Sequence, residues 1–223
     1  MAEPIHISSS FKWLNFTQFF GALNDNLFKL FITFALISTL GPEQEADIIS
    51  KISAIFTIPF LLFAAPAGYL ADKVSKQKII IFSKGLELVT MSVATWVFYS
   101  NQYHILYYVL FFMSVQSAFF GPAKYGAIPE IVSKVAIPKA NGQIQAFTYI
   151  AMILGTILAP AVTQLSNENY VVAGLFCVAM ALLGFVNSFF IPHLRVTERT
   201  SDEKWAFLRT LKEDHYLLIT ILS

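Results

Sequence analysis

Charged residues are scarce in this sequence, and cysteine is almost absent. Asp, Glu, Lys and Arg make up 13% of the 223 residues, whereas about 25% is usual in soluble domains. Apolar residues make up 56%, and the mean hydropathy is +0.62. This composition excludes an ordinary soluble domain and indicates a polytopic membrane protein. The single cysteine, Cys177, excludes an intramolecular disulfide, and its apolar surroundings in the sequence predict a small core residue.

The sequence also lacks the motifs of the common enzyme classes. It contains no Gly-x-Ser-x-Gly turn, no glycine-rich phosphate loop, no His-x4-Asp acyltransferase motif and no Cys/His metal cluster. We therefore expect neither an enzyme nor a cofactor or metal site in this segment. The net charge of +1 says little about partners, but the basic residues form no binding stripe, so we expect no nucleic acid partner. The N-terminus has no basic region of the kind that begins a signal peptide.

Long apolar runs separated by turn residues predict six membrane-spanning helices. A helix needs about 20 apolar residues to cross the hydrocarbon core of a bilayer. Gly-Pro, Asn-Gln and Ser-Asn-Glu-Asn clusters and a charged stretch interrupt the runs. The fold class that follows is an all-α bundle of six transmembrane helices within residues 1–192. The predicted spans are Phe11–Leu40, Ile48–Leu70, Ile79–Tyr99, Tyr103–Phe120, Gln143–Gln164 and Tyr170–Ile191.

Basic residues concentrate on alternate loops of this predicted bundle. The opposite loops carry Glu43, Glu45, Asp47 and Glu168, with only Lys51 as a basic residue. Because lysine and arginine are enriched in cytoplasmic loops, the N-terminus and the even-to-odd loops are predicted to be cytoplasmic. The basic residues on that side are Lys12, Lys73, Lys76, Lys78, Lys84, Lys124, Lys134, Lys139, Arg195, Arg199, Lys204, Arg209 and Lys212.

The composition changes abruptly after Pro192. Residues 193–214 are charged and polar, and they predict a cytoplasmic linker. Four apolar residues of this linker are spaced as one face of a short amphipathic helix, which we expect to lie on the membrane surface. Residues 215–223 are apolar again but too few to cross a membrane, so we expect the start of a seventh helix. The amphipathic set consists of Trp205, Phe207, Leu208 and Leu211.

The first predicted span carries an acid, a base and two amides in an otherwise apolar run. They are Asn24, Asp25, Asn26 and Lys29. An ionised side chain at the bilayer centre costs about 2.5–3.5 kcal/mol on the insertion scale, so such residues usually face a bundle interior or an aqueous cavity. The i, i+4 spacing of Asp25 and Lys29 lets the two charges pair on one helix face. We interpret the group as a transport site near the bilayer midplane; the alternative is a structural ion pair to a neighbouring helix.

Five other polar residues within the predicted spans have an expected role. Glu87 is too short to reach the headgroups and is expected to turn inward, as a cavity wall or a partner for Lys29. Lys84 is expected to extend to the cytoplasmic headgroups in a structural role. The remaining candidates for a polar cavity lining are Gln116, Gln145 and Asn187.

Residues 68–78, Gly-Tyr-Leu-Ala-Asp-Lys-Val-Ser-Lys-Gln-Lys, form a loop motif after the second span. The motif resembles the Gly-x-Leu-Ala-Asp-Arg-x-Gly-Arg-Lys signature of the major facilitator superfamily, with Ser75 in place of glycine. Small residues such as Gly68 allow two helices to approach closely. Asp72 is expected to cap or pair near the third helix, and Lys73 or Lys76 to pair with carboxylates across the cytoplasmic mouth. These residues are therefore gating candidates.

Gly155-Thr-Ile-Leu-Ala-Pro160 in the fifth span is similar to the Gly-x-x-x-Gly-Pro element of antiporters in the same superfamily. It predicts a contact face of small residues followed by a proline bend, so Gly155 and Pro160 join the gating candidates. The arginine that many superfamily members carry in the fourth span is absent. Its absence argues against the proton-coupled drug-efflux type.

A narrower resemblance links the chain to the bacterial lysophospholipid transporter family. It is carried by Asn24-Asp25-Asn26, by Gly-Pro-Ala-Lys-Tyr-Gly at 121–126, by Pro129-Glu130 and by Lys-Ala-Asn-Gly at 139–142. The first motif differs from the Gly-Asp-Asn that is common in the family. The resemblance implies the N-terminal half of a transporter with a missing C-terminal six-helix half, in a bacterial inner membrane. It places Lys124 and Tyr125 among the gating candidates.

The family resemblance further implies a substrate and partners. The substrate would be a lysophospholipid, typically lysophosphatidylethanolamine, moved between leaflets by alternating access for re-acylation. A fused or associated acyltransferase is a possible partner, beside the surrounding membrane lipids. Two alternatives stay open: a transporter of a small polar solute or drug coupled to Na⁺ or H⁺ through Asp25, and a membrane anchor for a fused enzyme.

Overall fold

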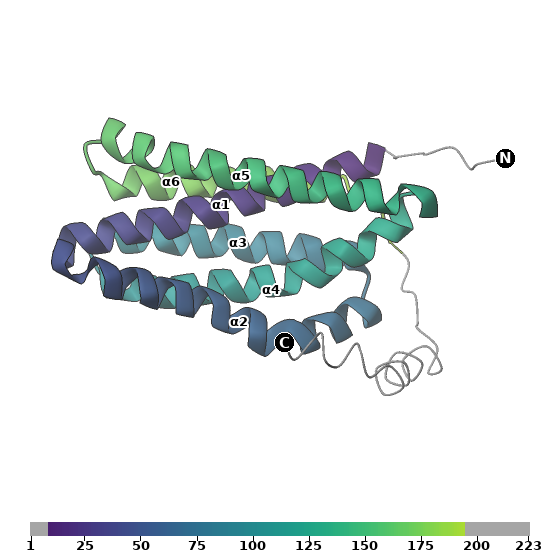
Figure 1. Cartoon of the computed structure of the whole chain (residues 1–223), viewed down its shortest axis with the longest axis horizontal. Coiled ribbons are helices and arrows are strands. Elements are labelled where there is room, and N and C mark those ends of the chain that lie inside the picture. Colours follow the sequence, from purple (N-terminus) through teal and green to yellow (C-terminus); the bar gives the residue numbers. More distant parts are fainter. Residues whose placement is uncertain (1–8, 195–223) are drawn as a thin grey trace, which may run out of the picture.

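The computed structural model describes residues 9–194, and these residues form a bundle of long α-helices (Figure 1). Three short 3₁₀ segments, η1 (Pro42–Gln44), η2 (Tyr103–Ile105) and η3 (Lys134–Ala136), precede α2, α4 and α5. The predicted linker at 193–214, apart from its first two residues, and the predicted start of a seventh helix at 215–223 lie outside the described residues. The helices are α1 (Ser9–Leu40), α2 (Glu45–Lys73), α3 (Lys76–Tyr99), α4 (Leu106–Ile131), α5 (Ile137–Leu165) and α6 (Tyr170–Ser188).

All six predicted spans coincide with helices, and each helix is long and apolar enough to cross a membrane. The prediction was wrong about the end of the fourth span, since α4 continues through Pro122 and Pro129 to Ile131. Proline removes one backbone hydrogen bond and strains a helix. Membrane helices tolerate this loss because neighbouring helices and side chains satisfy the freed carbonyl groups. Gly121-Pro122 therefore lies inside a helix.

The connections between helices fall at two opposite ends of the bundle. The α1–α2, α3–α4 and α5–α6 connections lie at one end in Figure 1, and the α2–α3 and α4–α5 connections lie at the other. The lysine-rich loops therefore share one end of the bundle, as the alternation of charge in the sequence requires. Which membrane face that end occupies stays a prediction.

Helix packing follows a row rather than a closed ring. The most extensive contacts join α2 to α4, α4 to α3, α3 to α6, α6 to α1, and α1 to α5. In Figure 1, α3 accordingly lies between the α5, α6 and α1 group and the α4 and α2 group. The two helices at the ends of the row, α2 and α5, are the least buried, with 17% of their most apolar segments inside the bundle. The faces of α2 and α5 that do not contact other helices expose large apolar side chains.

Two hydrophobic clusters form the core, separated by a layer of polar side chains. On α1 the larger cluster begins at Leu23 and the smaller cluster ends at Leu14; on α3 and α4 they leave similar gaps. The gaps on α3 and α4 hold Lys84, Glu87, Gln116 and Ser117, and Asn24 and Asp25 follow Leu23 on α1. We call these six residues the polar layer. A bilayer favours this arrangement, because polar groups that face inward avoid the hydrocarbon.

The two predicted close-packing glycines differ in outcome. A Cβ atom at Gly155 would lie 2.7 Å from Asn26 Nδ2, so α5 approaches α1 at this glycine as predicted. A Cβ atom at Gly68 would meet nothing within 4 Å. The prediction of a close helix approach at Gly68 was therefore wrong for the part of the chain that the structure describes. α5 also continues past Pro160, to Leu165.

Candidate substrate-binding site

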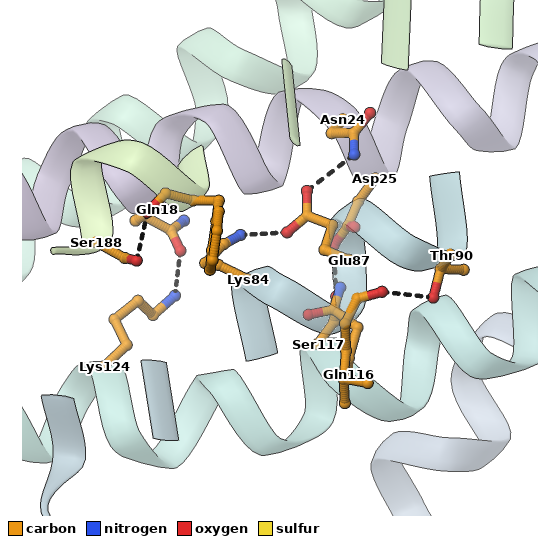
Figure 2. Close-up of polar contacts among 12 residues, drawn as sticks. Gln18, Asn24, Asp25, Lys84, Glu87, Thr90, Gln116, Ser117, Lys124 and Ser188 are labelled. Carbon is orange, nitrogen blue, oxygen red and sulfur yellow. Dashed lines mark hydrogen bonds and ion pairs between the residues drawn. The ribbon is translucent and has the colours of Figure 1, made fainter. Parts of the chain in front are cut away.

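A cavity of about 470 Å³ opens among α1, α2, α3 and α4 beside the polar layer (Figure 2). One acid, Asp25, and two lysines, Lys84 and Lys124, contribute to its lining, together with aromatic rings. The cavity thus combines charges of both signs with apolar surface. Its lining residues are Gln18, Gly21, Ala22, Asp25, Phe60, Lys84, Ser117, Phe120, Gly121, Pro122, Lys124 and Tyr125.

Asp25 faces this cavity and is oriented by α4. Ser117 Oγ donates to Asp25 Oδ2 over 3.0 Å, and Gln116 Nε2 in turn donates to Ser117 Oγ over 2.8 Å. The other carboxylate oxygen, Oδ1, is buried and accepts no hydrogen bond from residues 9–194. Buried carboxylate oxygens usually have a donor. Asp25 is therefore held by one oxygen and leaves the other for a cation or a donor.

Lys84 and Glu87 form a buried ion pair within α3, and Glu87 links this pair to α1. Lys84 Nζ lies 2.5 Å from Glu87 Oε2, and the side chains of both residues are almost fully buried. Asn24 Nδ2 donates to the other oxygen, Glu87 Oε1, over 2.8 Å. Figure 2 shows this chain of contacts from Lys84 through Glu87 to Asn24. Pairing and the added hydrogen bond offset the cost of burying two charges.

This geometry corrects two predictions. Lys84 does not extend to the headgroups, because its ammonium group turns into the bundle toward Glu87. Glu87 does turn inward as predicted, but its partner is Lys84 and not Lys29. The three-residue spacing of Lys84 and Glu87 on one helix face was the sequence signal for this pair.

Lys124 reaches across the cavity from α4 to α1. Its Nζ donates to Gln18 Oε1 over 2.8 Å, and Gln18 Nε2 donates to Thr148 Oγ1 on α5 over 2.6 Å. The same ammonium group lies 4.5 Å from the ring centroid of Tyr125 and 5.7 Å from that of Phe120. Aromatic faces attract cations. Lys124 and Tyr125, expected as gating residues, thus lie on the cavity wall.

The predicted pair of Asp25 and Lys29 does not form among the described residues. Lys29 Nζ instead lies over the ring of Phe56 on α2, 4.1 Å from the centroid. Asn26 also points away from the cavity, since its Nδ2 donates to the carbonyl of Met152 on α5 over 2.7 Å. Neither Lys29 nor Asn26 lines the cavity described above, and that they belong to a transport site at the midplane stays a prediction. The i, i+4 spacing of Asp25 and Lys29 permits a pair, but Asp25 contacts α4 and Lys29 contacts α2 instead.

The weaker candidates fall outside the cavity as well. Gln145 is exposed on α5, and Asn187 donates to the carbonyl of Leu183 one turn earlier in α6. Gln116 does not line the cavity, but it donates a hydrogen bond to Ser117, which does. Of these three weaker candidates, only Gln116 belongs to the network around Asp25.

At the lysine-rich end, one predicted gating contact forms within the described chain. Lys76 Nζ lies 2.6 Å from Glu130 Oε1, which joins the start of α3 to the end of α4. Asp72 has neither a cap nor an ion pair with any residue in 9–194, contrary to prediction, and Lys73 is exposed there. The third helix begins without a side-chain cap at Ser75.

Sequence reasoning missed several residues that the structure brings to the cavity. Gln18, Ser117 and Phe120 line it, and none had been assigned a role. Gln18 precedes Asp25 by seven residues and so shares its helix face, which was a usable signal. Within residues 9–194, no group of three or more His, Cys, Asp or Glu side chains gathers as a metal site requires. The cavity lining combines the carboxylate of Asp25, the ammonium groups of Lys84 and Lys124 and the amide of Gln18, a set that suits a zwitterionic organic ligand.

Comparison with known proteins places this arrangement in a family. Residues 14–223 match the model of the Major Facilitator Superfamily. The chain is 28% identical over 213 residues to a lysophospholipid transporter of Photorhabdus laumondii, covering 96% of this chain and 50% of that protein. It is 31% identical over 201 residues to a lysophospholipid transporter of Escherichia coli strain SE11, covering 87% and 47%. The chain spans about half the length of these curated relatives. Because the superfamily model matches most of its length, the chain belongs to the Major Facilitator Superfamily.

Proposed function

We propose that this chain is the N-terminal six-helix half of a bacterial lysophospholipid transporter, and that a second six-helix half completes it. The relatives that carry this name, and their twofold greater length, support the proposal. In transporters built from two repeats, the substrate lies between the repeats near the midplane. The residues that line the cavity beside Asp25 would then form one side of the substrate site. The N-terminus would be cytoplasmic, in a bacterial inner membrane.

The charges of the cavity carry the proposal. A lysophosphatidylethanolamine headgroup has one phosphate and one ammonium group, separated by two carbons. Lys124 is positioned by Gln18 to bind the phosphate, and Asp25, with a free carboxylate oxygen, to bind the ammonium. Charge-assisted hydrogen bonds of this kind are roughly twice as strong as neutral ones. The rings of Phe60, Phe120 and Tyr125 supply apolar surface for the glycerol and the start of the acyl chain.

The proposed direction of transport is from the outer to the inner leaflet, by alternating access. A fused or associated acyltransferase would then re-acylate the lipid. The unoccupied oxygen of Asp25 also favours a second role, since a carboxylate that exchanges its ligand can couple transport to Na⁺ or H⁺. On this view the same carboxylate binds the coupling ion and the ammonium group in different steps.

Substitution of Asp25 tests the site. The assay is the movement of fluorescent lysophosphatidylethanolamine in vesicles that contain the two-half protein, in which the 223-residue chain is joined to a second six-helix half. Asp25→Ala should abolish transport and leave membrane insertion intact. Asp47→Ala is the control, because Asp47 is an exposed acid that pairs only with Lys51 among the described residues. Wild-type transport by Asp25→Ala would overturn the assignment.

The same assay tests the proposed half and the substrate. Transport by the 223-residue chain alone, without any second half, would overturn the half-transporter proposal. Transport that requires the second half would support it. A two-half protein that moves a small polar solute in the presence of Na⁺ or H⁺, and no lysolipid, would favour the ion-coupled alternative.

A further inference from the structure

Gly21 is the residue that makes room for the ammonium group of Lys84. It lies on α1 one turn before Asp25, on the wall of the cavity. A Cβ atom built at Gly21 would collide with Lys84 Nζ and would lie 3.3 Å from Lys84 Cε. Real Cβ atoms essentially never come so close to a nitrogen. Any larger residue at this position would therefore move the ammonium group from its present place.

Because Gly21 has no side chain, Lys84 can contact both the interior of the bundle and the cavity. Its ammonium group pairs with Glu87 inside the bundle, and its side chain also lines the charged cavity. The ammonium nitrogen lies 4.6 Å from the ring centroid of Phe120, and that of Lys124 lies 5.7 Å from the same centroid. Two lysines thus converge on one aromatic ring at the cavity wall.

The two lysines differ in their partners. Lys124 has a neutral partner, the amide of Gln18, whereas Lys84 has a charged one, the carboxylate of Glu87. Glu87 would not lose every contact if Lys84 turned away, because Asn24 donates to its other oxygen. The ion pair can therefore open with one hydrogen bond on Glu87 retained.

We propose that Lys84 exchanges the carboxylate of Glu87 for the phosphate of the substrate, and that Gly21 is the positioning residue that allows this exchange. The inference rests on the proposed function and adds a second phosphate-binding residue to it. In the empty site, Glu87 holds Lys84 and keeps its charge paired. When a phosphate enters, Lys84 and Lys124 bind it together above Phe120, and Glu87 stays on Asn24.

The exchange makes opposite predictions for two variants. Gly21→Ala displaces the ammonium group and should weaken the binding of lysophosphatidylethanolamine about tenfold, the size expected for one lost charge-assisted hydrogen bond. Glu87→Gln removes the competing carboxylate while it keeps an amide oxygen near Asn24, and it should tighten binding of the same lipid. Neither variant should change the binding of a monoacylglycerol with the same acyl chain, because that lipid has no phosphate.

Gly142→Ala is the matched control. Gly142 also lies inside a helix, and a Cβ atom there would meet nothing within 4 Å. Both alanine variants gain the same helix propensity. A difference between them in lipid binding therefore reports the contact with Lys84 and not a general effect of alanine on a helix.

Equilibrium binding of both fluorescent lipids to the purified two-half protein decides the proposal. Weaker phosphate-dependent binding by Gly21→Ala, with wild-type binding by Gly142→Ala, supports it, as does tighter binding by Glu87→Gln. Equal binding by the two glycine variants, or unchanged binding by Glu87→Gln, overturns the exchange but leaves the proposed function standing. If Gly21→Ala does not fold, Glu87→Gln decides alone. A wild-type protein that binds neither lipid overturns the proposed function and the exchange with it.

Discussion

Helices α1 and α2 have similar lengths but opposite relations to the bundle. Half of the most apolar segment of α1 is buried, against 17% for the matching segment of α2, although α2 is the more apolar of the two. Soluble proteins show the reverse, because there the most apolar helices lie inside. In this chain, high hydropathy therefore indicates a helix that is exposed to lipid, whereas polar residues within a span indicate a helix that lies inside the bundle.

The contacts of the two helices explain the difference. α1 packs extensively against both α5 and α6 and carries Asn24 and Asp25 into the polar layer. α2 packs extensively only against α4 and presents exposed Leu61 and Leu62 on another face. Lipid chains are as apolar as leucine, so an exposed leucine is not penalised in a membrane. We therefore expect α1 to be sensitive to substitution and α2 to be tolerant.

The largest difference is expected for a matched pair of leucines. Leu27 on α1 is fully buried, whereas Leu61 on α2 is 76% exposed. Leu27→Ala should lower the free energy of unfolding by about 2–5 kcal/mol, because it leaves a cavity that cannot fully collapse. Leu61→Ala should change it by less than about 0.5 kcal/mol. Denaturant unfolding of the 223-residue chain in detergent, followed by helical circular dichroism, measures both.

Equal losses for the two leucine variants would contradict the comparison, since they would show that α2 is packed as tightly as α1. A Leu61→Ala loss larger than that of Leu27→Ala would do so more strongly. Leu62, which is 62% exposed on the same helix, provides a second control position on α2.

A smaller difference is expected for a pair of polar residues. Asn24 on α1 is fully buried and donates to Glu87, whereas Thr57 on α2 is exposed and bonds only to the carbonyl of Ser53 in its own helix. Asn24→Ala leaves Glu87 Oε1 without its donor and should cost about 1–3 kcal/mol. Thr57→Ala should cost less than about 0.5 kcal/mol. The same unfolding assay applies, and an Asn24→Ala variant as stable as Thr57→Ala would show that Glu87 has another donor.

The sequence was sufficient to predict the helices of this fold, because a membrane imposes strong constraints on length and composition. Every apolar run of about 20 residues became a helix, and two boundaries were wrong by more than a turn. α4 continues past Phe120 to Ile131, and α5 begins at Ile137, before the predicted Gln143. The sequence could not reveal that Pro122 would lie inside α4. A proline stops a helix in water but not in a packed membrane bundle, and the packing is a tertiary property.

Only part of the candidate site could be predicted in the same way. Intramembrane charge identified Asp25 and Glu87, because burying a charge needs a reason. The partners could not be predicted, since Asp25 bonds to Ser117 over a separation of 92 residues and Lys124 to Gln18 over 106. Lys84 was misplaced for a related reason: its four-carbon side chain can extend outward or inward, and the room left by Gly21 decides which.

The smallest expected effect concerns Gly68 on α2, and its sign is opposite to the others. Alanine in place of an unpacked helical glycine gains up to about 1 kcal/mol of helix propensity. Because a Cβ atom at Gly68 meets nothing within 4 Å, Gly68→Ala should stabilise the 223-residue chain by up to that amount in the unfolding assay. A loss of stability in this chain would contradict the view that this face of α2 is free. A gain of stability in the 223-residue chain combined with a loss in the two-half protein would sharpen the comparison. It would show that the second half packs against α2 at Gly68. The close helix approach that the loop motif predicts at Gly68 would then be an approach to the second half.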